Sequence, residues 1–177
     1  MDNFKNGDII LTSKSSFIVW LMRYFQSDPV IYGHALVVDV DNKCALEAGW
    51  TIRATPLEEV FKIKRHKHYK IVRYTELTDE QIRVMFKAMY SLMGKFYSFK
   101  RILLQVLDHL FYTNWFTKLD KSKASQVCSS YVAWGYYVAC GVKFNGVPWQ
   151  SCDPDDVDDH ALANPDKWVL LEEKQLL

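Results

Sequence analysis

Three residues of this chain have the types and positions needed for nucleophilic acyl chemistry: Cys128, His34 and Glu47. Cys128 follows Ser125-Gln126-Val127, where the pattern predicts the start of a helix over residues 125–140. The unpaired N–H groups and the positive dipole end of a helix start favour the thiolate, which is the form of cysteine that attacks a carbonyl carbon. The alternative for Cys128 is a cysteine that only packs as a small buried apolar residue.

His34 and Glu47 belong to two neighbouring expected strands that flank the turn signal Asp41-Asn42. If that turn has two residues, Leu36 stands opposite Glu47, and His34 is the diagonal neighbour of Glu47 on the same face. Diagonal Cβ atoms are about 7 Å apart, within reach of a His–Glu hydrogen bond. A one-residue slip in register would move Glu47 to the other face. The pair is either a base held by a carboxylate or a structural histidine with a polar partner.

The elements that must position these residues predict an α+β fold, with a small antiparallel sheet packed against helices. Alternation and short apolar runs predict strands over residues 9–11, 34–39, 44–48, 69–74 and 168–171. Capping residues, Pro and Gly predict helices over 17–25, from 55–59, from 78–81 to about Gly94, over 100–111 and over 125–140. A further turn that begins with Pro is expected at Asp153-Pro154.

Length and composition narrow the class of protein. The 177 residues fit a single domain, 1–177, and the net charge of +1 argues against a nucleic-acid partner. The four cysteines form no CxxC pair, which argues against a zinc-ribbon or thioredoxin-type site. The start of the chain carries Asp2 and Asp8 and lacks the apolar core of a signal peptide, and no apolar run is long enough for a transmembrane segment. We therefore expect a cytoplasmic protein with free thiols, or one released by lysis if it is phage-encoded.

Several short motifs, spread over most of the chain, together resemble a known family. They are Gly7-Asp8-Ile9-Ile10-Leu11, Tyr32-Gly33-His34-Ala35-Leu36-Val37-Val38, Leu46-Glu47-Ala48, Thr55-Pro56-Leu57, Gly94-Lys95-Phe96-Tyr97, Cys128-Ser129-Ser130-Tyr131-Val132 and Asp153-Pro154-Asp155-Asp156-Val157. In this order they resemble the circularly permuted NlpC-type cysteine peptidases, a papain-like superfamily of cell-wall hydrolases, and within it the YiiX-like branch. As in that permuted branch, His34 and Glu47 precede Cys128 in the chain.

The resemblance implies a permuted papain-like topology and a role for each matched residue. Cys128 would be the nucleophile, His34 the base, Glu47 the group that orients the imidazole, and Tyr97 would place its hydroxyl near the oxyanion. The implied activity is that of a cysteine peptidase or amidase (a hydrolase) that cleaves an amide bond through a thioester intermediate. The implied substrate is a peptide or another small amide, such as a peptidoglycan fragment. Neither a cofactor nor a metal ion is expected.

Two segments keep other functions open. Lys100–Phe116 is rich in leucine and aromatic residues, so it could be a core or lid helix, or a helix that lies on a membrane surface or forms a dimer. In the membrane case, the same triad would serve a lipid-directed acyltransferase or thioesterase. The basic run Phe61–Lys70 is either a solvated loop or edge strand, or a patch for an anionic polymer or lipid surface. A binding module that has lost catalysis is the remaining alternative.

Overall fold

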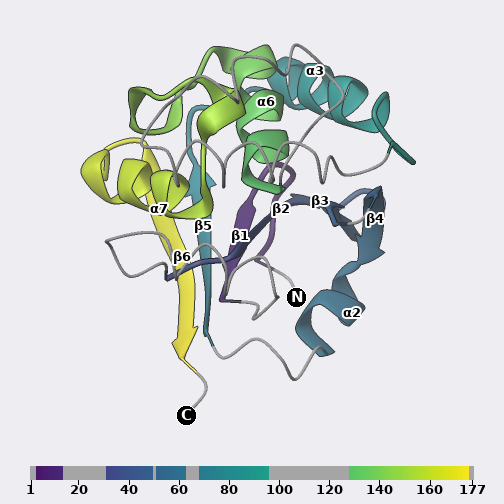
Figure 1. Cartoon of the computed structure of the whole chain (residues 1–177), viewed down its shortest axis with the longest axis horizontal. Helices are drawn as coiled ribbons and strands as arrows, with labels where there is room; N and C mark the ends of the chain where they lie inside the picture. Colours follow the sequence, from purple (N-terminus) through teal and green to yellow (C-terminus); the bar gives the residue numbers. More distant parts are fainter. Residues whose placement is uncertain (1–2, 14–30, 50, 63–67, 96–127, 176–177) are drawn as a thin grey trace, which may run out of the picture.

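The computed structural model describes residues 3–13, 31–49, 51–62, 68–95 and 128–175 (Figure 1). Its strands are β1 (Ile9–Thr12), β2 (His34–Asp39), β3 (Cys44–Ala48), β4 (Ile52–Pro56), β5 (His68–Tyr74) and β6 (Trp168–Gln175). Its helices are α2 (Leu57–Lys62), α3 (Asp79–Tyr90), α6 (Cys128–Cys140) and α7 (Pro154–Ala163), with short 3-10 turns η1 (Phe144–Gly146) and η2 (Trp149–Ser151). The expected α+β class is confirmed.

The six described strands form one antiparallel sheet in the order β4-β3-β2-β1-β5-β6. In the β2–β3 hairpin, Leu36 lies opposite Glu47, which confirms the register expected from the sequence. The turn occupies residues 40–43, and the Lys43 N–H donates to the Val40 carbonyl oxygen at 3.0 Å. This register places Glu47 diagonally across from the first residue of β2, His34.

Apolar side chains cover both faces of the sheet. One face, which carries Ile9 and Leu11, packs in a cluster with residues of α3, α6 and α7. The other face, which carries Ile10 and Leu36, packs with Leu57 of α2 and its neighbours. Figure 1 shows α2 well apart from the other three helices. Because strands buried on both faces need no polar side, their sequences read as nearly continuous apolar runs.

Some expected elements differ from the structure. The sequence does not predict strand β4, which lies at the edge of the sheet. Pro56 is the last residue of this strand and not the first residue of a helix, so α2 begins one residue later than the sequence predicts. Proline is tolerated there because the edge of a sheet does not require its missing N–H. The last strand extends to Gln175, beyond the expected Leu171. The helices expected over 17–25 and 100–111 lie outside the described residues.

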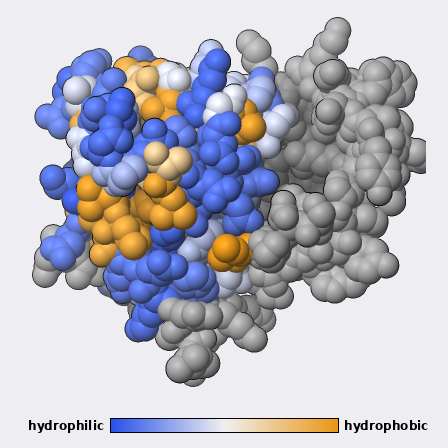
Figure 2. Space-filling model, turned by 90° about the vertical axis from the view of Figure 1, so that its left-hand side faces the viewer, coloured by the Kyte–Doolittle hydropathy of each residue, from blue (hydrophilic) through white to orange (hydrophobic). Residues whose placement is uncertain are grey.

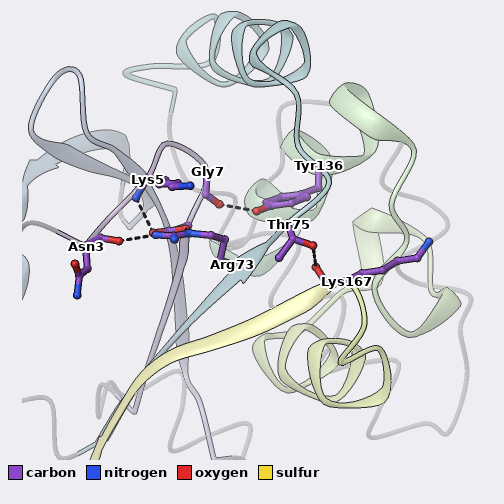
Figure 3. A network of polar contacts seen from close by, with 8 residues as sticks. Asn3, Lys5, Gly7, Arg73, Thr75, Tyr136 and Lys167 are labelled. Atoms are coloured by element: carbon purple, nitrogen blue, oxygen red, sulfur yellow. Dashed lines mark hydrogen bonds and ion pairs between the residues drawn. The ribbon is translucent and has the colours of Figure 1, made fainter.

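The Gly7-Asp8 motif at the start of β1 has a structural role, part of which is drawn in Figure 3. The buried carboxylate of Asp8 accepts from Arg73 Nε at 2.7 Å, from Arg73 Nη2 at 2.8 Å and from the Lys5 N–H at 2.8 Å. The Tyr136 hydroxyl donates to the Gly7 carbonyl oxygen at 2.5 Å. Gly7 has a φ of 90°, which glycine adopts without strain. These bonds join the start of β1 to β5 and α6.

In the described parts of the chain, no helix has both the length and the apolar character to cross a bilayer. On the side of the molecule where α7 and β6 lie in Figure 1, small apolar patches alternate with hydrophilic side chains (Figure 2). Leu162 of α7 and Leu170 of β6 are among the exposed apolar residues, at 60% and 50%. Exposed leucines are common on protein surfaces, so these do not identify a partner.

Candidate active site

The fold brings Cys128 and His34 together, although they are distant in sequence. Cys128 is the first residue of α6, and His34 is the first residue of β2. The two side chains are close enough for each to shift the pKa of the other, and the Cys128 Sγ atom lies 4.0 Å from the Gly33 carbonyl oxygen. Cys128 is 6% exposed and His34 is 9% exposed, so both side chains are buried. The thiol therefore lies directly beside an imidazole, at the first described residue of α6.

His34 also contacts the carboxylate of Glu47, as the hairpin register predicts. The His34 Nε2 atom lies 2.6 Å from Glu47 Oε2, and both residues are buried. Because Nε2 is occupied by Glu47, Nδ1 is the ring nitrogen left to face Cys128. The three side chains thus form a chain of contacts from carboxylate to imidazole to thiol, which is the connectivity of a nucleophile, a base and an orienting group.

The environment favours charge separation between the thiol and the imidazole. Burial raises the pKa of the Cys128 thiol, but the neighbouring His34 and hydrogen bonds from the Ala35 and Ser129 backbones lower it below its ordinary value. Burial lowers the pKa of His34, but the charge of Cys128 and hydrogen bonds to Cys128 and Glu47 raise it to about 9. These opposite shifts favour a thiolate–imidazolium pair over the neutral thiol and imidazole.

Glu47 has two further partners that the sequence did not reveal, Arg53 and Thr55. Its Oε1 atom accepts from Arg53 Nε at 2.8 Å and from the Thr55 hydroxyl at 2.6 Å. Burial raises the pKa of Glu47, but hydrogen bonds from His34, Thr55 and Arg53 hold it well below its usual range. A signal was present in the sequence, because the β-branched residues of 51–55 follow a turn residue, Gly49, as a third strand would.

The other three cysteines have the opposite electrostatics. Burial raises the pKa of Cys44, of Cys140 and, most strongly, of Cys152. All four cysteines are free thiols. Cys128 is therefore the one cysteine of the chain whose surroundings favour the thiolate.

Hydrogen bonds from α7 and its leading segment hold the backbone around the site. The Asp155 carboxylate accepts from the N–H groups of Ile31 at 3.2 Å and Tyr32 at 3.0 Å, just before the histidine strand. The Ser129 hydroxyl, next to the thiol, donates to the Cys152 carbonyl oxygen at 2.7 Å. Asp155 of the Asp153–Val157 motif therefore holds the segment before β2, and Ser129 of the Cys128–Val132 motif holds α6 to the segment before α7. Together these contacts keep α6 and β2 in position relative to each other.

Three further predictions from the sequence concern residues that lie wholly or partly outside the described ranges. Tyr97 lies outside the described residues, as do Lys100–Phe116 and much of the basic run. Within the described ranges, no group of three or more His, Cys, Asp or Glu side chains is placed to hold a metal ion.

Comparison with known proteins gives a likeness at the level of the fold. No family model matches the sequence, and no curated protein matches it significantly. The structure is similar to the crystal structure of yiiX from Escherichia coli O157:H7, titled a metalloprotein and DUF1105. The TM-score is 0.67, over 96% of this chain and 97% of that chain, at 18% identity. The chain therefore has a YiiX-like α+β fold.

Proposed function

We propose that the chain is a cysteine hydrolase that cleaves an amide bond, with Cys128 as nucleophile, His34 as base and Glu47 as the orienting carboxylate. The observation that carries this proposal is the continuous contact from Glu47 through buried His34 to Cys128 at the start of α6. The opposite pKa shifts of the thiol and the imidazole support it, because perturbed values cluster at functional sites.

The proposed reaction has two steps. The Cys128 thiolate attacks the carbonyl carbon, the C–N bond breaks, and the His34 imidazolium gives its proton to the leaving amine. His34, now neutral, takes a proton from water as the water attacks the thioester, which releases the acid and restores the thiolate–imidazolium pair. Glu47 stabilises the imidazolium and keeps Nδ1 directed at sulfur.

We further propose that the whole chain forms one catalytic domain with the permuted NlpC-type, papain-like topology. The order of the site residues along the chain supports this proposal, as does a fold similarity that extends over 96% of the chain. The proposed substrate is a peptide amide of peptidoglycan type. The likeness of the sequence motifs to those of cell-wall hydrolases supports this choice of substrate.

The similar crystal structure is titled a metalloprotein, but the residues described for this chain do not suit a metal ion. The described residues contain no cluster of three or more suitable side chains. The oxygens of Glu47 are also engaged by Arg53, Thr55 and His34. The described residues therefore do not fit a metal ion, and no step of the proposed reaction passes through one.

The proposal is tested with the full chain and peptidoglycan-derived peptides, with products identified by mass spectrometry. We expect Cys128→Ala to abolish release of the amine product, while Cys140→Ala, at a half-buried thiol with a raised pKa, retains it. Turnover by Cys128→Ala at the wild-type rate would show that the assignment is wrong. Circular dichroism of both variants checks that the fold is intact.

Two alternatives are distinguished from the proposal by further assays. A binding module without catalysis predicts that iodoacetamide labels Cys128 no faster than Cys140 at neutral pH. A lipid-directed acyltransferase predicts co-sedimentation with phosphatidylglycerol or phosphatidylcholine vesicles and transfer of an acyl group to an acceptor other than water. That second alternative rests on Lys100–Phe116, which lies outside the described residues.

A further inference from the structure

The two oxygens of the Glu47 carboxylate have separate partners. Oε2 lies 2.6 Å from His34 Nε2. Oε1 accepts from Arg53 Nε at 2.8 Å and from Thr55 Oγ1 at 2.6 Å, and Arg53 Nη2 lies 2.7 Å from the same oxygen. The two donors from strand β4 therefore bind Oε1, and Oε2 is left for the His34 imidazole.

The sheet register holds these donors in place. Arg53 lies directly opposite Glu47 in the β3–β4 pair, and Thr55 lies opposite Ala45, which makes Thr55 a diagonal neighbour of Glu47. Residues two apart in a strand share a face, so Arg53 and Thr55 reach the same carboxylate. The Arg53 side chain is 55% exposed and that of Glu47 is 5% exposed. An exposed cation thus anchors a buried anion.

A carboxylate with His34 as its only partner would be free to rotate about its terminal torsion and to exchange its oxygens. Donors on Oε1 remove that freedom, and charge-assisted hydrogen bonds to a carboxylate also stabilise its ionised form. An ionised, oriented Glu47 in turn stabilises the protonated imidazole, which stabilises the thiolate of Cys128. Outer partners of this kind commonly set the orientation of a site residue.

We propose that Arg53 and Thr55 are positioning residues that fix Oε1 of Glu47, so that Oε2 stays on His34 and Cys128 is held as the thiolate. This inference rests on the proposed function, in which that thiolate is the nucleophile. Neither residue touches the reacting atoms. Their effect reaches the substrate only through Glu47, His34 and Cys128.

The test measures how the rate of Cys128 alkylation by iodoacetamide depends on pH, with peptide mapping to identify the labelled cysteine. Thr55→Val removes the hydroxyl at nearly constant shape, and Thr55→Ser keeps it. Arg53→Gln removes the charge, and Arg53→Lys keeps the charge without the two-nitrogen contact. Arg83→Gln is the matched control, because Arg83 pairs with Glu80 on the exposed face of α3.

We expect Thr55→Val and Arg53→Gln each to move the midpoint of the alkylation curve upward by about one pH unit, which slows labelling about tenfold below the midpoint. Thr55→Ser should restore the wild-type curve, Arg53→Lys should lie between, and Arg83→Gln should match the wild type. With a peptide substrate, kcat should fall while KM stays constant. Arg53 is half exposed, so its variants test the inference even if a Thr55 variant folds poorly.

Wild-type midpoints in both Thr55→Val and Arg53→Gln would overturn the inference, and so would equal losses in Thr55→Ser and Thr55→Val. A raised KM with unchanged kcat and an unchanged alkylation curve would place Arg53 in substrate binding and would also overturn it. These outcomes differ from failure of the proposed function. In that case wild-type Cys128 would itself react no faster than Cys140.

Discussion

His34 and Glu47 meet across the β2–β3 hairpin because Leu36, two residues after His34, lies directly opposite Glu47. The diagonal pair closes to 2.6 Å between Nε2 and Oε2. The register of one short hairpin thus sets which ring nitrogen faces the carboxylate and which faces Cys128. A one-residue slip would move Glu47 to the other face of the sheet and would leave His34 without this carboxylate.

The shifted pKa values predict a bell-shaped pH profile for amide hydrolysis. The ascending limb should lie below the ordinary thiol value of about 8.5, because the site lowers the pKa of Cys128. The descending limb should lie near pH 9, where the His34 imidazolium loses its proton.

In His34→Gln, the midpoint for Cys128 alkylation should rise toward the ordinary thiol value. An unchanged midpoint in that variant would show that His34 does not stabilise the thiolate.

Glu47 should make the folded chain sensitive to acid. Its pKa is lower in the folded chain than in the unfolded chain, so its stabilising contribution is present above about pH 4.3 and is lost as the pH falls. The loss amounts to about 1.4 kcal/mol for each unit by which the pKa is depressed. We expect urea unfolding of Glu47→Gln to show a smaller drop in the free energy of unfolding between about pH 5 and pH 3. Equal drops in both proteins would contradict this prediction.

Asp155→Ala should loosen the segment that leads into the histidine strand. The substitution removes the acceptor for the Ile31 and Tyr32 N–H groups, and hydrogen bonds to a charged group each contribute about 1.5–3 kcal/mol. Because the bond from Ile31 is exposed, we expect the low end for the two bonds, a free energy of unfolding lower by about 3 kcal/mol, together with slower alkylation of Cys128. Asp159→Ala, at an exposed position of the same helix, is the control and should change neither value measurably.

Gly135→Ala should destabilise the packing of α6 on α3. A Cβ atom at residue 135 would lie 2.7 Å from Met89 Sδ and 3.3 Å from Met85 Cγ. Both methionines are fully buried, so the clash should cost about 1–3 kcal/mol despite the better helix propensity of alanine. In thermal unfolding, Gly135→Ala combined with Met89→Ala should lose less stability than the sum of the two single variants. Additive losses would argue against this contact.

The central hairpin and several helix boundaries could be predicted from sequence because short-range interactions determine them. The apolar run from Ala35 to Val38 and the turn after Asp39 define the β2–β3 register. Thr78 and Gln81 form the capping box that begins α3. At Asp153-Pro154 the sequence predicts only a turn, whereas the structure has the helix α7, which Asp153 caps in the same way through Asp156.

The sequence does not predict strand β4, nor the contacts of its residues Arg53 and Thr55 with Glu47. Only Ile52 and Thr55 of its central residues are buried, and the exposed residues between them break the alternation that marks a strand. An arginine that is half exposed also reads as an ordinary surface residue. Its role becomes visible only when the β3–β4 register places it opposite Glu47.

The sequence by itself determined the types of the candidate site residues, the helix that carries Cys128 and the hairpin that joins His34 to Glu47. These features depend on interactions among residues close in the chain. Only the tertiary structure decided that Cys128 contacts His34 and that Arg53 and Thr55 share one oxygen of Glu47. Such contacts depend on how α6 packs on the sheet and on which strand pairs with β3. The local sequence pattern determines neither of these.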